Sequence, residues 1–229
     1  MAVIVVKDEQ KNVSAPAESG SNAVHVFFLL DETGSMDSVR KETITGFNEY
    51  VQTLKAKTPS IRMTLGKFNA CSGLQFVVSD TPITDVPPLT EKTYTPDCGT
   101  PLYDAIGRMI AHAEKHCNGS DGVLIIIQTD GYENSSTEFT QASVKALIQK
   151  KTDEDGWTVS FIGADIDAHA VGTGIGLANT HLVGYSGDAH NVGTTFSNLA
   201  NDTAHYCSST AGMSAPQRRK AMFFRSSYR

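Results

Sequence analysis

The sequence lacks several features that would assign it to a common class of protein. Its four cysteines among 229 residues are far apart and include no C-x-x-C pair. This spacing argues against a zinc ribbon or a disulfide framework, and it predicts a reduced chain. No apolar run is long enough to span a membrane, and the short apolar segment 2–6 is followed at once by Asp8 and Glu9, unlike a signal peptide. We therefore expect a cytoplasmic protein, with a virion or a specialised export route as the alternatives.

Positive charge is also scarce in most of the chain. The formal net charge is -6, which argues against a general nucleic-acid binder because such proteins are normally basic. Residues 208–229 differ from the rest, since they contain five basic residues and no acidic one. This segment is either a solvated end or a basic tail that docks on an acidic partner, another copy of the chain, nucleic acid or anionic lipid. Self-association through the tail is thus one expectation.

The body of the chain has the pattern of one large α/β domain. We place this domain at residues 23–207, between a linker-like segment 1–22 and the tail 208–229. Strand-like and helix-like segments alternate through it, which predicts a mainly parallel sheet with helices on both faces. The expected strands are 26–30, 61–65, 74–78, 123–127, 157–163 and 181–184, and the expected helices are 44–54, 102–113, 138–151, 168–177 and 191–207. The segments 61–65 and 74–78 flank a turn, so we expect an antiparallel hairpin at the edge of the sheet.

Two of these strands end in a carboxylate. The apolar run 26–30 leads into Asp31, Thr33 and Ser35, and the run 123–127 leads to Asp130. Open α/β sheets place ligand sites at the carboxyl ends of their strands, so these side chains and Thr100 converge if the two strands are neighbours. Such hard oxygen ligands suit Mg²⁺, although Ca²⁺ and Mn²⁺ accept them too. The alternative is purely local, with Thr33 or Ser35 capping a helix and Thr100 capping one that begins at Pro101.

The pattern Asp31-Glu32-Thr33-Gly34-Ser35, followed by Thr100 and then by Thr129-Asp130-Gly131, resembles a known site. It is similar to the metal-ion-dependent adhesion site (MIDAS) of von Willebrand factor type A (vWA) domains, with Thr33 where the D-x-S-x-S pattern has serine. The resemblance covers about residues 24–207 and is greatest to bacterial and phage intracellular members. It implies a Rossmann-like, doubly wound fold. It also implies that the metal is bound, directly or through water, by Asp31, Thr33, Ser35, Thr100 and Asp130.

In the family that the sequence resembles, an acidic side chain of a protein partner often completes the metal shell. The resemblance therefore implies a non-enzymatic adaptor or assembly factor in which the ion is a bridge. A second hypothesis is a haloacid-dehalogenase-like phosphotransfer enzyme with Asp31 as nucleophile and Asp130-Gly131-x-x-Asn134 as its Mg²⁺ loop. Such an enzyme needs a phosphate-binding lysine, and Lys145 and Lys150 lie on a predicted surface helix. A third hypothesis is a structural component of a larger particle with an incidental metal site.

Other clusters give weaker signals. His112, His116 and Cys117 are spaced to bind zinc from one helix, but no further ligand has matching spacing, so we interpret them as a solvated face. Asp165 and Asp167 follow an expected strand, and we interpret them as caps of the next helix. Glu133 and Asn134 are expected at the rim of the metal site.

Overall fold

The computed structural model describes residues 24–58, 60–118, 121–221 and 223–224, so the predicted linker 1–22 lies outside the described residues. A six-stranded sheet has the order β3-β2-β1-β4-β5-β6. Every neighbouring pair is parallel except β2 and β3, which confirms the predicted antiparallel edge hairpin. The strands are β1 (Val24–Asp31), β2 (Arg62–Asn69), β3 (Gly73–Pro82), β4 (Gly122–Thr129), β5 (Thr158–Ala164) and β6 (Leu182–Tyr185).

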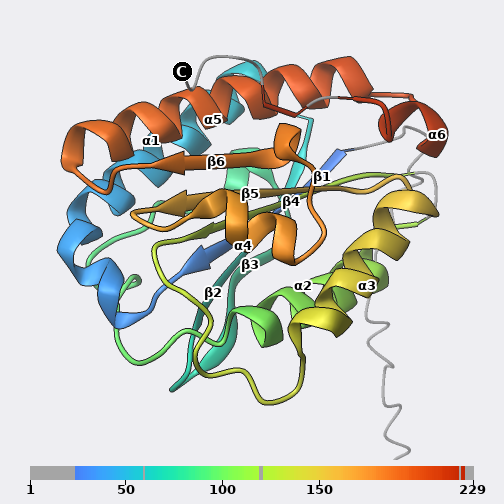
Figure 1. Cartoon of the computed structure of the whole chain (residues 1–229). Helices are drawn as coiled ribbons and strands as arrows, with labels where there is room; N and C mark the ends of the chain where they lie inside the picture. The colour runs from blue at the N-terminus through green and yellow to red at the C-terminus, as the bar shows by residue number, and fades with distance from the viewer. Residues whose placement is uncertain (1–23, 59, 119–120, 222, 225–229) are drawn as a thin grey trace, which may run out of the picture.

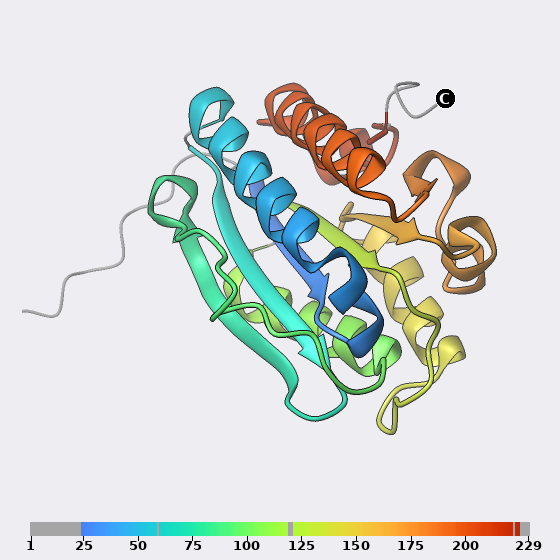
Figure 2. The same ribbon diagram turned by 90° about the vertical axis from the view of Figure 1, so that its left-hand side faces the viewer.

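Helices cover both faces of the sheet, as predicted (Figure 1). On one face α1 (Arg40–Lys57) and α5 (Ala189–Thr210) run side by side (Figure 2). The other face carries α2 (Leu102–His116), α3 (Gln141–Asp153) and α4 (Ala168–Gly174). The short helices are η1 (Gly34–Val39), η2 (Ile83–Asp85), η3 (Asn179–His181) and α6 (Ala215–Arg218). Among the described residues, no helix is both long and apolar enough to cross a membrane.

The central strand β1 is buried along its whole length. Successive side chains of a strand point to opposite faces, and β1 has apolar residues for both. Phe28 packs on Phe47 of α1 with ring centroids 5.3 Å apart, whereas Phe27 belongs to the core on the α2 side. The continuous apolar run of the sequence is therefore explained by helices on both faces.

Several element boundaries differ from the prediction for local reasons. Strand β3 extends to Pro82, beyond the expected end at 78, and η2 follows it directly. Helix α3 begins at Gln141 rather than 138, because Thr140 and Ser143 form a capping box there. Helix α4 ends at Gly174, where the prediction ran to 177.

Part of the segment that the sequence sets apart as a tail packs on the body. Helix α5 continues past the expected boundary at 207 to Thr210, and α6 follows. Phe223 is buried, with its ring centroid 5.6 Å from that of Tyr206, and the basic side chain of Arg218 is also buried. The described part of this segment is therefore not a solvated end, and the predicted self-association cannot use Arg218 as an exposed charge.

The prediction of a chain without disulfides is wrong. Cys71, in the turn between β2 and β3, is bonded to Cys98, with 6.0 Å between their Cα atoms. They meet because the segment before α2 folds back to the end of β2, where the Ala70 amide donates to the Gly99 carbonyl at 2.9 Å. The two cysteines are 27 positions apart in the sequence, and the segment between them carries no motif that indicates the pairing. Cys117 and Cys207 are free thiols.

Candidate metal centre

The two strands with terminal carboxylates are direct neighbours in the sheet. Leu30 pairs with Gln128 in the parallel β1–β4 register, so Asp31 and Asp130 reach the same edge. From η1, the Ser35 hydroxyl donates to Oδ1 of Asp130 at 2.6 Å, and it lies 3.2 Å from the hydroxyl of Thr33. Together with the hydrogen bond from the Thr33 amide to Asp31, these contacts join four of the five predicted ligands at the carboxyl end of the sheet.

The Asp31 carboxylate is buried and held from several directions. The Thr33 amide donates to Oδ1 at 2.7 Å, and the Thr129 hydroxyl donates to Oδ2. The Tyr94 hydroxyl donates to the Asp31 backbone carbonyl at 2.7 Å. The sequence carries no indication of Tyr94, and it shows Thr129 only as part of the motif Thr129-Asp130-Gly131, not as a residue that contacts Asp31.

Thr100, the fifth predicted ligand, is held by the loop after β4. Its amide donates to Oδ1 of Asn134 at 2.8 Å, and the Asn134 amide donates back to the Thr100 carbonyl at 3.1 Å. A Cβ at Gly131 would lie 2.8 Å from the Thr100 hydroxyl, so this glycine lets the hydroxyl approach the chain beside Asp130. Asn134 therefore positions Thr100, and its place at the rim of a metal site stays a prediction.

The local alternative for these hydroxyls does not fit the structure. Thr33 is the N-cap residue of η1 but its side chain makes no capping hydrogen bond within the described structure. Helix α2 begins at Leu102 with Pro101 in the N-cap position, one residue later than Thr100 capping requires. By contrast, Asp167 does cap α4, accepting from the Ala170 amide at 2.9 Å. The hydroxyls at the candidate site are therefore not explained as helix caps.

Burial makes the site electrostatically unfavourable without a cation. It raises the pKa of Asp31 to about 6, and the Asp130 charge adds to the rise while hydrogen bonds from Thr129 and Thr33 oppose it. Burial also raises the pKa of Asp130, with the Asp165 carboxylate contributing. The nearby Lys67 ammonium is already paired with Oε1 of Glu32 at 2.6 Å. The donor set of hydroxyls and carboxylates therefore fits a divalent cation such as Mg²⁺.

We predict that Gly131→Ala weakens Mg²⁺ binding about 10-fold, the scale of effect when a group that orients a ligand is disturbed. The added methyl group would displace the Thr100 hydroxyl from the site. Isothermal titration calorimetry measures the affinity. Gly193→Ala in α5 is the matched control, because a Cβ at Gly193 meets nothing within 4 Å. Equal Mg²⁺ affinity in Gly131→Ala and wild type would show that Thr100 is not a ligand of the ion.

No protein-family model matches the sequence, and no match is found among curated proteins. Solved structures do match. One is proximal thread matrix protein 1 from the mussel byssus with a zinc-occupied MIDAS motif: 17% identity, TM-score 0.56, covering 80% of this chain and 48% of that one. This chain thus spans about half the length of the mussel protein.

Two further matches come from other organisms. The vWF domain of a type V pilus tip protein from Porphyromonas gingivalis has 13% identity and a TM-score of 0.58, with 80% of this chain and 95% of that chain covered. The manganese-loaded TRAP protein of Plasmodium vivax has 16% identity and a TM-score of 0.52, with coverage of 72% and 69%. Identities this low carry information about the fold alone.

Proposed function

The chain has the fold of a von Willebrand factor type A domain, and we propose that it is a non-enzymatic protein-binding module that acts through a divalent metal ion. Asp31, Thr33, Ser35, Thr100 and Asp130 would hold the ion at the carboxyl end of the sheet. When bound, the ion would supply a coordination position for a partner. An acidic side chain of that partner would complete the shell.

The contact between Ser35 and Asp130 carries this proposal. It joins η1, which follows β1, to the end of β4, and the two residues are 95 positions apart in the sequence. Ser35 is exposed while Asp31 behind it is buried, so the cluster opens outward. An open cluster of oxygen ligands suits an ion that binds a second molecule.

We propose Mg²⁺ as the ion, with Ca²⁺ and Mn²⁺ as alternatives, because all three prefer oxygen ligands. Zinc in the mussel protein and manganese in the Plasmodium protein are the ions named for those structures. Replacing the usual serine by Thr33 keeps the hydroxyl that would face the ion. Direct comparison of these metals in a titration would rank them.

The role of intracellular adaptor or assembly factor stays a prediction, as does the absence of nucleic-acid binding. Structural disulfides are rare in the reducing cytosol, so the Cys71–Cys98 bond weighs against a cytoplasmic location. Self-association and a role as a structural component of a larger particle both depend on contacts between chains, so each stays a prediction.

The phosphotransfer hypothesis finds less support in the geometry. Asp31 would have to attack phosphorus, yet its carboxylate is 0% exposed and accepts a hydrogen bond on each oxygen. Lys145, one of the lysines that such an enzyme could use, is exposed on α3 and packs beside Gly176 instead. We therefore propose a binding function rather than a catalytic one.

Titration calorimetry with Mg²⁺ tests this proposal. We expect wild type to bind one ion and Asp31→Ala to lose binding, with no phosphatase turnover in either protein. Asp37→Ala is the matched control, because Asp37 is an exposed acidic residue of η1 that is not among the five predicted ligands. Turnover that disappears with Asp31 would instead support the phosphotransfer enzyme, and absence of metal binding in wild type would contradict the proposed site.

A further inference from the structure

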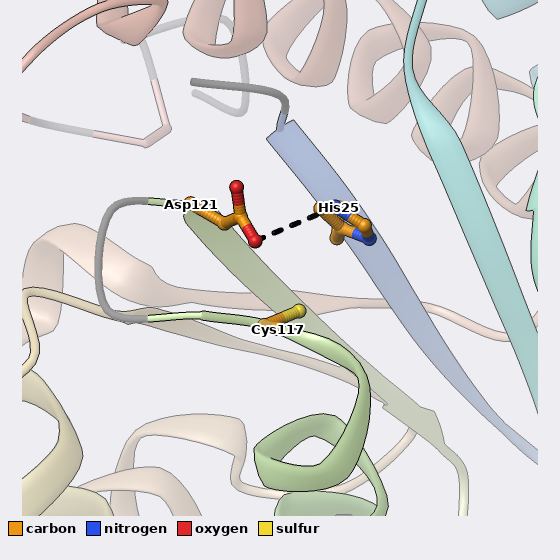
Figure 3. A group of neighbouring side chains, drawn as sticks. All are labelled: His25, Cys117 and Asp121. Atoms are coloured by element: carbon orange, nitrogen blue, oxygen red, sulfur yellow. Dashed lines mark ion pairs between the residues drawn. The ribbon is translucent and has the colours of Figure 1, made fainter. Parts of the chain in front are cut away.

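A second group of potential metal ligands lies at the opposite end of the sheet. His25 is near the start of β1, Asp121 immediately precedes β4, and Cys117 follows the last residue of α2 (Figure 3). The three side chains come from three different elements and point toward one another. About 20 Å of strand separates His25 from Asp31, at roughly 3.3 Å per residue. This cluster is therefore distinct from the candidate metal centre.

The ligand atoms are close enough for one ion. One atom from each side chain lies within 4.8 Å of the other two, and Nε2 of His25 is 4.0 Å from Oδ2 of Asp121. Zn²⁺ binds nitrogen, sulfur and oxygen at about 2.0–2.3 Å, which places tetrahedral ligand atoms about 3.3–3.8 Å apart. Side-chain movements of about 1 Å would bring the three ligand atoms to these separations. His25 and Asp121 are buried and Cys117 is half-buried.

His25 is oriented as metal-binding histidines are. Its other ring nitrogen, Nδ1, lies 3.2 Å from Oδ1 of Asp80 and is hydrogen-bonded to it. A proton on Nδ1 leaves the Nε2 lone pair facing the Asp121 carboxylate, so two acceptors face each other. A carboxylate behind a histidine fixes the ring and its tautomer in many zinc sites. Asp121 is fixed as well, since its Oδ2 accepts from the Asn118 amide at 2.9 Å.

The backbone of β3 is distorted where it presents Asp80. The β2–β3 register shifts between Met63 and Leu65, which puts an extra residue into β3 beside Asp80. Asp80 itself has a φ of 45°, a left-handed conformation that is unfavourable for a residue with a side chain. Bulges of this kind re-aim side chains and are frequent beside functional sites. The Arg62 guanidinium, 2.6 Å from Oδ1 of Asp80, holds the carboxylate in place.

We propose that His25, Cys117 and Asp121 form a second metal site, with Asp80 orienting His25, and that it takes a transition-metal ion of the zinc type. Imidazole, thiolate and carboxylate together select zinc-like ions, whereas the all-oxygen set at the other end selects Mg²⁺-like ones. Three protein ligands leave one coordination position for water or another group.

The neighbouring histidines have other partners and are not needed. His112 lies 2.9 Å from the Ser79 hydroxyl through Nε2, and its ring stacks on that of His116 with centroids 4.1 Å apart. His116 uses Nδ1 to donate to the carbonyl of His112 at 2.8 Å. The sequence pairs Cys117 with these two residues, but the structure turns it toward His25 and Asp121 instead.

Cobalt binding, followed by absorption spectroscopy, tests the second site. We would titrate Co²⁺ into the full chain, purified without reductant so that Cys71 and Cys98 stay paired. A Cys117 thiolate bound to Co²⁺ gives a near-ultraviolet charge-transfer band, and Zn²⁺ should displace it. We expect the band in wild type and in Asp31→Ala, saturating at one equivalent. The first metal centre contains no sulfur and cannot produce it.

The variants separate this site from its neighbours. Cys117→Ser should abolish the band, and Asp80→Asn should weaken Co²⁺ binding about 10-fold to 100-fold. His116→Gln, next in sequence to Cys117 but outside the cluster, should leave the band unchanged. Circular dichroism establishes that each variant is folded. A folded wild type without the band, or a band that survives Cys117→Ser, would overturn the proposal.

Discussion

Replacing both Cys71 and Cys98 with serine should lower the free energy of unfolding by about 3–4 kcal/mol, the value expected for a disulfide that closes a loop of this length. The bond links residues 27 positions apart, and without it the unfolded chain gains conformational freedom. Urea denaturation monitored by circular dichroism measures the change. This is a large fraction of the 5–15 kcal/mol by which domains are stable.

The same substitution should also weaken Mg²⁺ binding. The Cys98 carbonyl accepts from the Gly34 amide at 3.0 Å, and the Asp97 amide donates to the Glu32 carbonyl at 3.0 Å. The disulfide therefore holds the loop that lies against the turn containing Thr33. Dithiothreitol provides the matched control, because it should destabilise wild type and leave the double variant unchanged. Identical unfolding curves for wild type with and without reductant would show that the bond does not stabilise the fold.

Asp31→Asn should stabilise the metal-free protein while abolishing Mg²⁺ binding. Burial raises the pKa of this carboxyl from 3.8 to about 6, and a shift of that size corresponds to about 3 kcal/mol. The buried charge thus lowers the stability of the metal-free protein at pH 7 by up to about this amount. A neutral amide of the same shape removes the charge. Urea unfolding in EDTA at pH 7 should show the gain.

The stability difference between Asp31→Asn and wild type should depend on pH. Between pH 4 and 6 the folded state of wild type binds more protons at Asp31 than the unfolded state does, so its free energy of unfolding falls as pH rises through this range. The advantage of Asp31→Asn should therefore grow from near zero at about pH 4 to its full value above pH 6. Asp37→Asn, at an exposed position, is the control. A gain that is constant with pH would exclude titration of Asp31 as its cause.

The parts of the site that could be predicted lie where strands end. The apolar runs before Asp31 and Asp130 identify buried parallel strands. Because ligand sites in open α/β sheets lie at the carboxyl ends of the strands, both aspartates could be predicted as ligands. The structure places Asp31 at the end of β1 and Asp130 directly after the adjacent strand β4, and Ser35 donates to Asp130. Thr100 was harder to predict as a ligand, because a threonine directly before Pro101 could equally be the N-cap of the following helix.

The parts that could not be predicted depend on contacts between distant segments. Tyr94 reaches the backbone of Asp31 from a loop whose sequence has no periodic pattern. The Cys71–Cys98 bond and the approach of Cys117 to His25 likewise follow from how loops and helix ends pack. The spacing of these residues along the sequence does not indicate such packing. The burial of Phe223 against Tyr206 has the same origin, since a basic segment with aromatics fits a solvated tail equally well.

The central position of β1 has a consequence for how the chain assembles. Residues of β1 can pair with β2 soon after both are synthesised, but pairing with β4 joins positions such as Asp31 and Thr129, which are 98 residues apart. Closing so long a loop between parallel strands is slow, because its entropy is lost before the contacts form. The chain should therefore spend the longest part of its folding time with β1 and β4 still unpaired, and the candidate metal centre, whose residues follow both strands, should form only in the last step.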